Sequence, residues 1–477
     1  MLVSPVVADG GRAVYTVSLA AANPRLAQVE AQIPLAAGDL LMYPEGAEAW
    51  EHGWATFVDR LVALDEGGKR LDIVTTGRDA WKVVGAPPGT ATIRLRYSVR
   101  IEHDQHPTKW DFGYKEVAYA RPDFVFLTGK ALFITQMGQT DIAVHFDLPR
   151  DWRVLSGWER VPASPATFRV KGPQQLTEVA IAVGTPVVHT RSAGTVTAHI
   201  ASGRGSAASA AVIAETVGRL LESTRSYFGA APVGDVLIVA EVDPAYVGGG
   251  AAFHRSVSLL LHEPATVTNR RRWGHILAHE LFHLWNGQAI QAPIDGQEYW
   301  FTEGFTEYVS SGLEARLGLI TSEELLGALA EHARLYLASA GEVSMRDAGQ
   351  DKAAHYDLVY SGGAMVAFAL DVELLSRGGD GLRTLMRGMF ERFGDPNVRR
   401  FTVEDVRTMA SEVGSWPEAS GFLASFVTGT STLPVDAYFR RLGLRLERAE
   451  HLVRLVPLEA ATEEQRQIRE RWLAGGW

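Results

Sequence analysis

The period of the hydrophobic pattern changes along this chain, and this change constrains its architecture more than any other feature. Every second residue of segment 93–101 is apolar, namely Ile93, Leu95, Tyr97, Val99 and Ile101. Such alternation is typical of a half-buried antiparallel strand. Segments 141–149 and 177–186 predict further strands that end in proline or glycine turns. From residue 206 the apolar residues recur at helical spacing instead. We therefore predict a multidomain α+β fold with an antiparallel β domain at residues 1–187.

The rest of the chain predicts a mixed region followed by a helical one. A helix from 206 to 228, a strand at 235–242 and a glycine loop leading into a strand at 254–261 are expected first. A long helix should then run from 270 to Asn286-Gly287, which are good C-terminal signals. From about 320 the pattern is mostly helical, and Thr462 and Gln465 have capping-box spacing for a terminal helix.

Composition excludes several classes of function. A net charge of −10 argues against a nucleic-acid partner. The absence of cysteine rules out a thiol nucleophile, a thiolate metal site and a disulfide framework. No apolar run approaches the roughly 18 residues of a membrane helix, and the first residues lack a signal-peptide pattern. We expect a soluble protein without a membrane partner. It is cytoplasmic by default, or periplasmic or secreted if a signal was removed. Oligomeric state stays open.

One short stretch carries the candidate chemistry. "HILAHELFHLW", residues 275–285, holds three histidines at a spacing of four. His279 and His283 would lie on one helix face, with Glu280 about 100° around it. Two neutral imidazoles can hold Zn²⁺ and leave coordination positions open. Glu280 is then placed to act as general base on a metal-activated water.

His275 offers a competing pair. It is also four residues from His279, but only the His279–His283 pair has glutamate directly after its first histidine. We therefore choose His279 and His283 as ligands. His275 is expected to be a buried or hydrogen-bonded histidine one turn before the site.

A third ligand is needed, and "WFTEGFTEYVSS" supplies Glu303. Nineteen residues separate it from His283, which suits a helix, a loop and a second helix folding back. Glu307, one turn later, could accept a hydrogen bond from a ligand histidine and fix its tautomer. The alternative is a solvated glutamate pair on a surface helix.

Tyr360 is a candidate oxyanion donor. It precedes a predicted Ser-Gly-Gly turn and an apolar helix in "HYDLVYSGGAMVAF". A phenol there could donate a hydrogen bond to the tetrahedral oxyanion. Core packing is the alternative role, and Tyr356 is the competing phenol.

The glycines at 248–250 raise the question of a phosphate loop. No G-x-x-x-x-G-K-[ST] pattern is present, so phosphate binding is not supported. We expect these glycines to let a substrate backbone approach closely. The strand at 254–261 could then pair with an extended peptide as an added strand.

Four segments together resemble a known family. "AHELFHLWN", "EGFTEYVSSG", "VYSGGAMVAFALDVELL" and "FVTGTSTLPVDAYFRRLGLRL" are similar to the glycyl-aminopeptidase family of zinc metallopeptidases. These are gluzincins, with HExxH plus a glutamate, and are related to the aminopeptidase N and leukotriene-hydrolase group. The resemblance implies a β-sheet domain at 1–187, a thermolysin-like zinc catalytic domain at 188–325 and a C-terminal α-helical domain at 326–477. It also implies that His279, His283 and Glu303 bind zinc, with Glu280 as base and Tyr360 as oxyanion donor.

The chain departs from this family in three places. About thirty residues follow the last similar segment, too few for the family's usual PDZ domain, and the link from the zinc helix to Glu303 is short. A "Gly-Leu-Glu-His" segment of the family is thought to bind the substrate's amino terminus. Here Gly249 and Gly250 precede it, His254 keeps its place, and Phe253 stands where the glutamate would be. A phenyl ring cannot make the charge-assisted hydrogen bond of a carboxylate. Glu116 could replace that carboxylate, or could be an ordinary surface residue.

These observations predict a zinc metallopeptidase with one Zn²⁺ per chain, acting on a peptide substrate. An aminopeptidase-like enzyme with altered recognition of the amino terminus is favoured. The alternatives are an endopeptidase or blocked-peptide hydrolase on the same scaffold, or a non-catalytic peptide-binding protein. A serine hydrolase has no local support, because no G-x-S-x-G segment is present.

Overall fold

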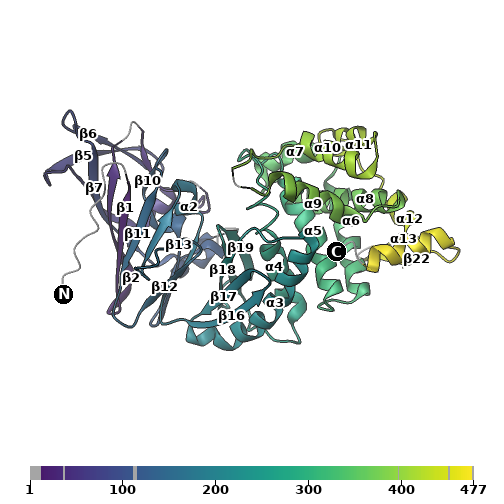
Figure 1. The fold of residues 1–477 in the computed structure, drawn as a ribbon, viewed down its shortest axis with the longest axis horizontal. Helices are drawn as coiled ribbons and strands as arrows, with labels where there is room; N and C mark the ends of the chain where they lie inside the picture. The colour runs from purple at the N-terminus through teal and green to yellow at the C-terminus, as the bar shows by residue number, and fades with distance from the viewer. Residues whose placement is uncertain are drawn as a thin grey trace. The chain divides into compact units, whose positions relative to one another are not determined.

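The structure, a computed structural model, describes residues 12–35, 38–43, 45–110, 115–395, 397–449 and 452–474 (Figure 1). The chain divides into two compact units. The first contains Met1–Arg191, Thr197–Ala214 and Asp235–Thr266, and the second contains Ser192–Val196, Glu215–Gly234 and Val267–Trp477. Strands dominate the first unit and helices the second, which confirms the predicted multidomain α+β fold. The boundaries of the three predicted domains stay a prediction.

The largest sheet of the first unit has eleven strands among the described residues, in the order β10-β3-β6-β5-β4-β7-β2-β1-β11-β14-β13. In chain order these strands are β1 (Val14–Ala20), β2 (Asn23–Pro34), β3 (Leu40–Leu41), β4 (Val58–Leu64), β5 (Arg70–Gly77), β6 (Ala80–Val84), β7 (Thr92–Arg100), β10 (Thr135–Gln136), β11 (Ile142–Asp147), β13 (Glu159–Arg160) and β14 (Thr167–Val170). Neighbouring strands are antiparallel except β1 and β11, which pair in parallel.

The alternating segment forms the centre of this sheet, as predicted. β7 pairs with β2 on one side and with β4 on the other. The four alternating apolar residues of β7 are all buried, and so is Ile101, which follows the strand. They pack into a core that also takes apolar side chains from β1, β2, β11 and β15. Period-two burial thus fixes the register, because a slip of one residue would turn this face to water.

Two smaller sheets complete the first unit. The four-stranded sheet has the order β12-β15-β9-β8 and the five-stranded sheet the order β16-β17-β18-β20-β19. Their strands are β8 (Tyr119–Arg121), β9 (Phe124–Thr128), β12 (Arg153–Ser156), β15 (Ala180–Gly184), β16 (Val187–Ala193), β17 (Val196–Ser202), β18 (Asp235–Val242), β19 (Gly249–Phe253) and β20 (Ser256–Leu261). The short helices are η1 (Gly53–Phe57), η2 (His103–Gln105), η3 (Pro107–Lys109), α1 (Gly129–Leu132), α2 (Pro173–Thr177) and η5 (Arg204–Ser206).

The structure of the glycine segment differs from two predictions. Gly249–Phe253 is not a loop but strand β19, which forms an antiparallel hairpin with β20. Strand β20 is therefore paired on both sides, with β18 and with β19. It has no edge left for an added peptide strand, so that prediction was wrong. Strand β19 forms one edge of this sheet, and β16 forms the other.

The second unit is mostly helical, and α3 (Ala207–Phe228) enters it from the first unit. Its other elements are α4 (Arg270–Phe282), α5 (Tyr299–Arg316), α6 (Ser322–Ser339), α7 (Met345–Ala348), η6 (Gly349–Asp351), η7 (Leu358–Gly362), α8 (Gly363–Ser376), α9 (Leu382–Phe393), α10 (Val403–Gly414), α11 (Ala419–Phe426), α12 (Val435–Arg441), β21 (Leu444–Ala449), β22 (Leu452–Pro457) and α13 (Glu463–Ala474). The β21–β22 hairpin was not predicted.

Helix α8 is the hydrophobic centre of this unit. Its residues from Gly363 to Leu375 are all buried, and α5, α6, α9, α10, α12 and α13 pack around it. A helix that is apolar on all sides is stable only when it is enclosed in this way. Among the described residues, Leu358–Ser376 is the one helix long and apolar enough to cross a membrane, contrary to the prediction that there is none. It is a core helix, because 94% of its apolar window is buried inside the protein.

Helix α13 begins with the predicted capping box. The Thr462 backbone N–H donates to Gln465 Oε1 at 2.8 Å, and the Gln465 N–H donates to Thr462 Oγ1 at 3.2 Å. Trp472 then anchors the helix, because its indole N–H donates to the Tyr308 hydroxyl at 2.7 Å. That hydroxyl donates to the Asp371 carboxylate at 2.6 Å, so one buried chain of hydrogen bonds joins α13, α5 and α8.

Two glycines let α5 and α8 touch backbone to backbone. A Cβ on Gly304 would lie 2.3 Å from Gly363 Cα, and a Cβ on Gly363 would lie 2.1 Å from the Trp300 carbonyl oxygen. No side chain fits at either position. This contact sets the distance between α5, which carries Glu303, and the segment that carries Tyr360.

We predict that Gly304→Ala lowers the free energy of unfolding by about 1–3 kcal/mol, because backbone atoms have to move to make room for the methyl group. Gly327→Ala is the matched control. Gly327 lies inside α6 with open space around its Cα, so alanine there should raise stability by about 1 kcal/mol through helix propensity. Urea unfolding of both variants measures the two effects. Equal stability of Gly304→Ala and the parent chain would contradict the close contact.

Candidate metal centre

The last turn of α4 presents the two predicted histidine ligands. The helix ends at Phe282, four residues before the predicted end at Asn286. The chain tightens there, because the backbone N–H groups of Trp285 and Asn286 both donate to the Phe282 carbonyl. His283 keeps helical backbone angles and its N–H still donates to the His279 carbonyl at 3.3 Å. The two histidines therefore share one face although the second lies at the helix end.

Three donor atoms converge. His279 Nε2 lies 3.0 Å from His283 Nε2, and Glu303 Oε2 lies 3.4 Å and 3.3 Å from these two nitrogens. All three residues are buried. Ligands about 2.0–2.1 Å from a tetrahedral zinc ion are about 3.3 Å apart, so this donor set fits such an ion. The structure thus brings together the three residues that the sequence singled out.

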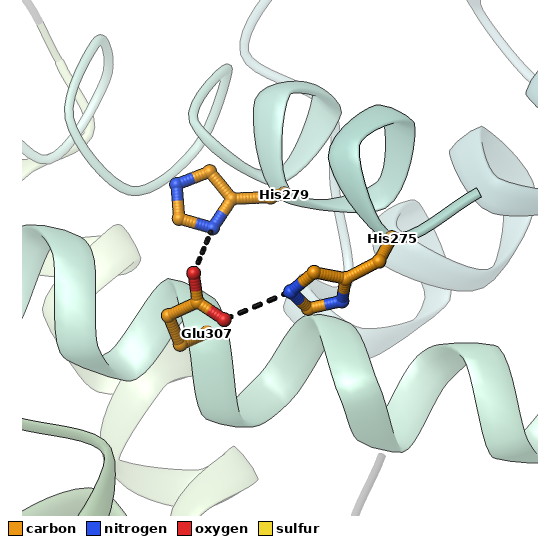
Figure 2. A group of neighbouring side chains, drawn as sticks. All are labelled: His275, His279 and Glu307. Carbon is orange, nitrogen blue, oxygen red and sulfur yellow. Dashed lines mark hydrogen bonds and ion pairs between the residues drawn. The ribbon is translucent and has the colours of Figure 1, made fainter. Parts of the chain in front are cut away.

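The second nitrogen of each ligand histidine has a hydrogen-bond acceptor nearby. His283 Nδ1 donates to the Asn286 carbonyl at 2.8 Å. His279 Nδ1 lies 3.3 Å from Glu307 Oε1, as Figure 2 shows. A proton held on each Nδ1 leaves the Nε2 lone pair for a metal ion. Glu307 thus lies where a tautomer-fixing carboxylate was predicted.

Two contributors were missed by sequence reasoning. Lys352 Nζ lies 3.0 Å from Glu303 Oε1, the oxygen that does not face the histidines. Asn286 was interpreted only as a helix-end signal, yet its amide donates to the carbonyls of Phe301 and Thr302 at 3.2 and 3.1 Å. It thereby ties the end of α4 to the turn of α5 that carries Glu303. No local pattern around Lys352 marks it in the sequence.

Tyr360 lies beside this centre, although not before a turn. It belongs to the π-helical segment η7, which continues directly into α8, so the predicted Ser-Gly-Gly turn is absent. π-Helical turns are frequent at functional sites. The Tyr360 ring stacks near that of His279, with 6.2 Å between centroids, and Tyr356 stacks on Tyr360 at 4.1 Å. Tyr356 is 43% exposed, whereas burial and the Glu303 charge keep the pKa of Tyr360 well above its usual value. The Tyr360 hydroxyl therefore keeps its proton at neutral pH.

The charges of the centre are coupled. Burial alone would raise the pKa of Glu303, but Lys352 and the two histidines lower it well below its usual value. Burial alone would lower the pKa of His279, but Glu307 and Glu303 raise it to about 9. Without a metal ion, His279 is therefore protonated at neutral pH. Glu280, the predicted base, is buried next to His279 in the same helical turn.

The predicted substrate-binding residues lie in the first unit. Gly249, Gly250 and Phe253 belong to β19, and His254 follows in the turn to β20. Phe253 is 2% exposed and packs in an apolar cluster with strands β9 and β18. The His254 backbone N–H donates to the Glu178 carbonyl at 2.8 Å, and burial lowers the pKa of its ring to about 4.

Glu116, the suggested substitute for the missing carboxylate, is already engaged. Its Oε2 lies 2.9 Å from the ammonium of Lys130, which is 5% exposed. Glu178 lies 3.5 Å from the same ammonium, and the Phe253 ring faces it at 5.7 Å. An internal cation therefore occupies the one carboxylate that sequence reasoning offered for a substrate amine.

Comparison with known proteins identifies the family. Residues 272–361 match the M61 glycyl aminopeptidase family, and residues 14–185 match the peptidase M61 N-terminal domain. Together the two matches cover more than half of the chain. The chain belongs to the M61 glycyl aminopeptidase family. The M61 family is a family of peptidases, and the match confirms the resemblance predicted from the sequence. No curated protein matches the chain.

Solved structures share the fold of this M61 chain. An aminopeptidase N family protein from Idiomarina loihiensis has a TM-score of 0.75 at 18% identity, over 91% of this chain and 79% of that one. An M1 zinc metallopeptidase from Deinococcus radiodurans has a TM-score of 0.57 at 16% identity, over 89% and 95% of the two chains. A mutant M1 zinc metallopeptidase from the same organism, bound to a Tyr-Ser-Ala substrate, has a TM-score of 0.56 at 16% identity, again over 89% and 95%. At these identities the likeness concerns the fold alone.

We predict that metal binding to the M61 chain competes with the proton on His279. Because the pKa of that imidazole is raised to about 9, a metal ion has to displace one proton at any lower pH, and the association constant should rise about tenfold per pH unit up to that value. Calorimetric titration of metal-free protein with Zn²⁺, in buffers of different ionisation heat, counts the protons released. About one proton from His279 is expected at pH 7.5. An affinity that does not change between pH 7 and 8.5 would contradict the assignment.

Proposed function

We propose that the protein is a zinc metallopeptidase, aminopeptidase-like but with altered recognition of the substrate's amino terminus, and that it holds one Zn²⁺ per chain. The observation that carries this proposal is the convergence of His279, His283 and Glu303 within 3.4 Å of one another. Membership of a glycyl aminopeptidase family and the fold of M1 zinc metallopeptidases support it.

Zinc bound by these three residues would polarise the scissile carbonyl and lower the pKa of a water molecule. Glu280 is the proposed general base, which takes a proton from the attacking water and passes it to the leaving amine. The Tyr360 hydroxyl is the proposed donor to the oxyanion. Its raised pKa supports this role, because a phenol acts as a donor only while it keeps its proton.

The surrounding charges keep the ligands in place. Lys352 pairs with the outer oxygen of Glu303 at 3.0 Å, so the inner oxygen stays directed at the histidines. Glu307 lies next to His279 Nδ1, and the Asn286 carbonyl accepts from His283 Nδ1. In this proposal the partners orient both imidazoles before any substrate binds, and that preorganisation is the chain's own contribution to catalysis.

Substrate recognition is proposed for strand β19. It forms the edge of the five-stranded sheet, and an extended peptide can add to such an edge through backbone hydrogen bonds. Gly249 and Gly250 carry no side chain that could block an added backbone, and His254 follows in the turn to β20. Phe253 provides no carboxylate for a free amine, and Glu116 is paired with Lys130. The Tyr-Ser-Ala substrate of the M1 neighbour supports a peptide as the ligand class.

Two further candidates remain on this scaffold. The absence of a carboxylate at Phe253 favours an endopeptidase or a hydrolase of blocked peptides over a strict aminopeptidase. A non-catalytic peptide-binding protein is the other candidate. The presence of Glu280 and Tyr360 beside the three ligands argues against it.

We predict that Glu280→Gln lowers the turnover of a peptide substrate about 100-fold or more while one zinc per chain stays bound, since the amide keeps the shape but cannot accept the proton. Glu323→Gln, an exposed glutamate on α6, is the matched control and should be unchanged. Metal analysis and peptide assays on the same samples separate binding from chemistry. Full activity of Glu280→Gln would refute the assigned base.

We also predict that an N-acetylated alanyl anilide is cut at a rate within about tenfold of the free form. The reason is that position 253 has no carboxylate to form a charge-assisted hydrogen bond with a free amine. Parallel assays of the two anilides measure the ratio, and zinc-free protein is the control for both. Cleavage of the free form alone would show that another residue binds the amino terminus and would restore a strict aminopeptidase.

A further inference from the structure

Three histidines, two on α4 and His283 directly after its end, create two possible groups of metal ligands, and His279 belongs to both. His279, His283 and Glu303 form the first group, and His275, His279 and Glu307 form the second. The two nitrogens of His279 divide between them. Nε2 faces His283 and Glu303, whereas Nδ1 lies 3.3 Å from Glu307 Oε1. The role of the second group depends on how His275 is bonded.

His275 is held between two carboxylates. Its Nε2 lies 2.8 Å from Glu307 Oε2, as Figure 2 shows, and its Nδ1 lies 2.8 Å from Glu314 Oε2. An ionised carboxylate only accepts hydrogen bonds, so each nitrogen has to donate one. Neither nitrogen then keeps a lone pair for a metal ion. This geometry favours a hydrogen-bonded link over a second metal site.

Glu307 therefore has a partner on each oxygen. Oε2 accepts from His275, and Oε1 faces His279. Its side chain is 14% exposed, and that of Glu314 is 2% exposed. Two carboxylates buried this deeply need a cation between them, because an unpaired buried charge is strongly destabilising. His332 lies farther off, with its Nε2 3.9 Å from Glu307 Oε2 and its Nδ1 3.1 Å from Ser361 Oγ.

We propose that His275 and Glu314 are positioning residues of the metal centre, which act through Glu307 by holding its carboxylate against Nδ1 of His279. The chain of contacts runs from Glu314 through His275 and Glu307 to His279. Its effect is to keep the His279 proton on Nδ1 and the Nε2 lone pair directed at the ion. This inference rests on the proposed zinc site. It extends that site by two residues, His275, one turn before His279 on α4, and Glu314, near the end of α5.

The test measures zinc affinity by competition with a chelator, so it does not depend on peptidase activity. His275→Gln replaces the two ring nitrogens by a single amide nitrogen and removes the positive charge between the carboxylates. It should weaken zinc binding about tenfold, the lower end for residues that orient a ligand. Glu314→Gln, a milder change, should weaken it in the same direction. His199→Gln on β17 is the matched control and should bind zinc like the parent chain. Thermal unfolding confirms that each variant is folded.

A double-mutant cycle with Glu307→Ala decides whether His275 acts through Glu307. In that background, His275→Gln should have no further effect on zinc affinity. The proposal is overturned if His275→Gln binds zinc as tightly as the parent chain, or if it loses the same factor with and without Glu307. It is also overturned if the parent chain binds two ions and the variant one, since His275 would then be a ligand. A parent chain that binds no zinc, or binds it unchanged after His283→Ala, would instead refute the proposed function itself.

Discussion

The structure of the second unit depends on one electrostatic constraint, which is that two imidazoles and a carboxylate are buried within 3.4 Å of one another. Groups this close, with little water around them, need protons or a metal ion to balance their lone pairs and charge. The raised pKa of His279 shows how the chain alone solves the problem, by holding a proton. A divalent ion would take over the same position. In the proposed function, proton and metal would therefore be alternative occupants of one set of donors.

The packing of the second unit brings these three side chains together. Gly304 and Gly363 allow α5 and α8 to touch, and Asn286 ties the end of α4 to α5. Around the donors, two of the carboxylates have a partner of their own, Lys352 for Glu303 and His275 for Glu307. The ligands are thus held by backbone contact and by paired charges together. Geometry of this kind orients ligands before the ion or the substrate arrives.

Sequence reasoning predicted what depends on local spacing. The alternation in β7, the one-turn spacing of His279 and His283 and the capping box of α13 are all visible in the structure. The need for a third ligand pointed to Glu303, which lies on the next helix. These features follow from the residue periods of helices and strands and from the number of ligands that a zinc ion needs. Both can be compared directly with the sequence.

The features that were missed depend on contacts between distant segments. Lys352 reaches Glu303 across 49 residues, and Glu314 reaches His275 across 39. Neither pair has a spacing that a helix or strand would reveal. The glycines of β19 were predicted to form a loop because glycine is uncommon in strands. Their strand conformation depends instead on pairing with β20. Helix α4 ends earlier than predicted because the Phe282 carbonyl accepts hydrogen bonds from a tight turn instead of continuing the helix. The Asn-Gly pair does not reveal this turn.

The proposed site holds one metal ion between His279, His283 and Glu303. Anomalous diffraction at the zinc absorption edge, from crystals grown with Zn²⁺, tests it most directly. If the site holds one zinc ion, a single strong peak is expected about 2.0–2.2 Å from the two Nε2 atoms and a Glu303 oxygen. A peak between His275 and Glu307, or no peak within reach of all three residues, would contradict it.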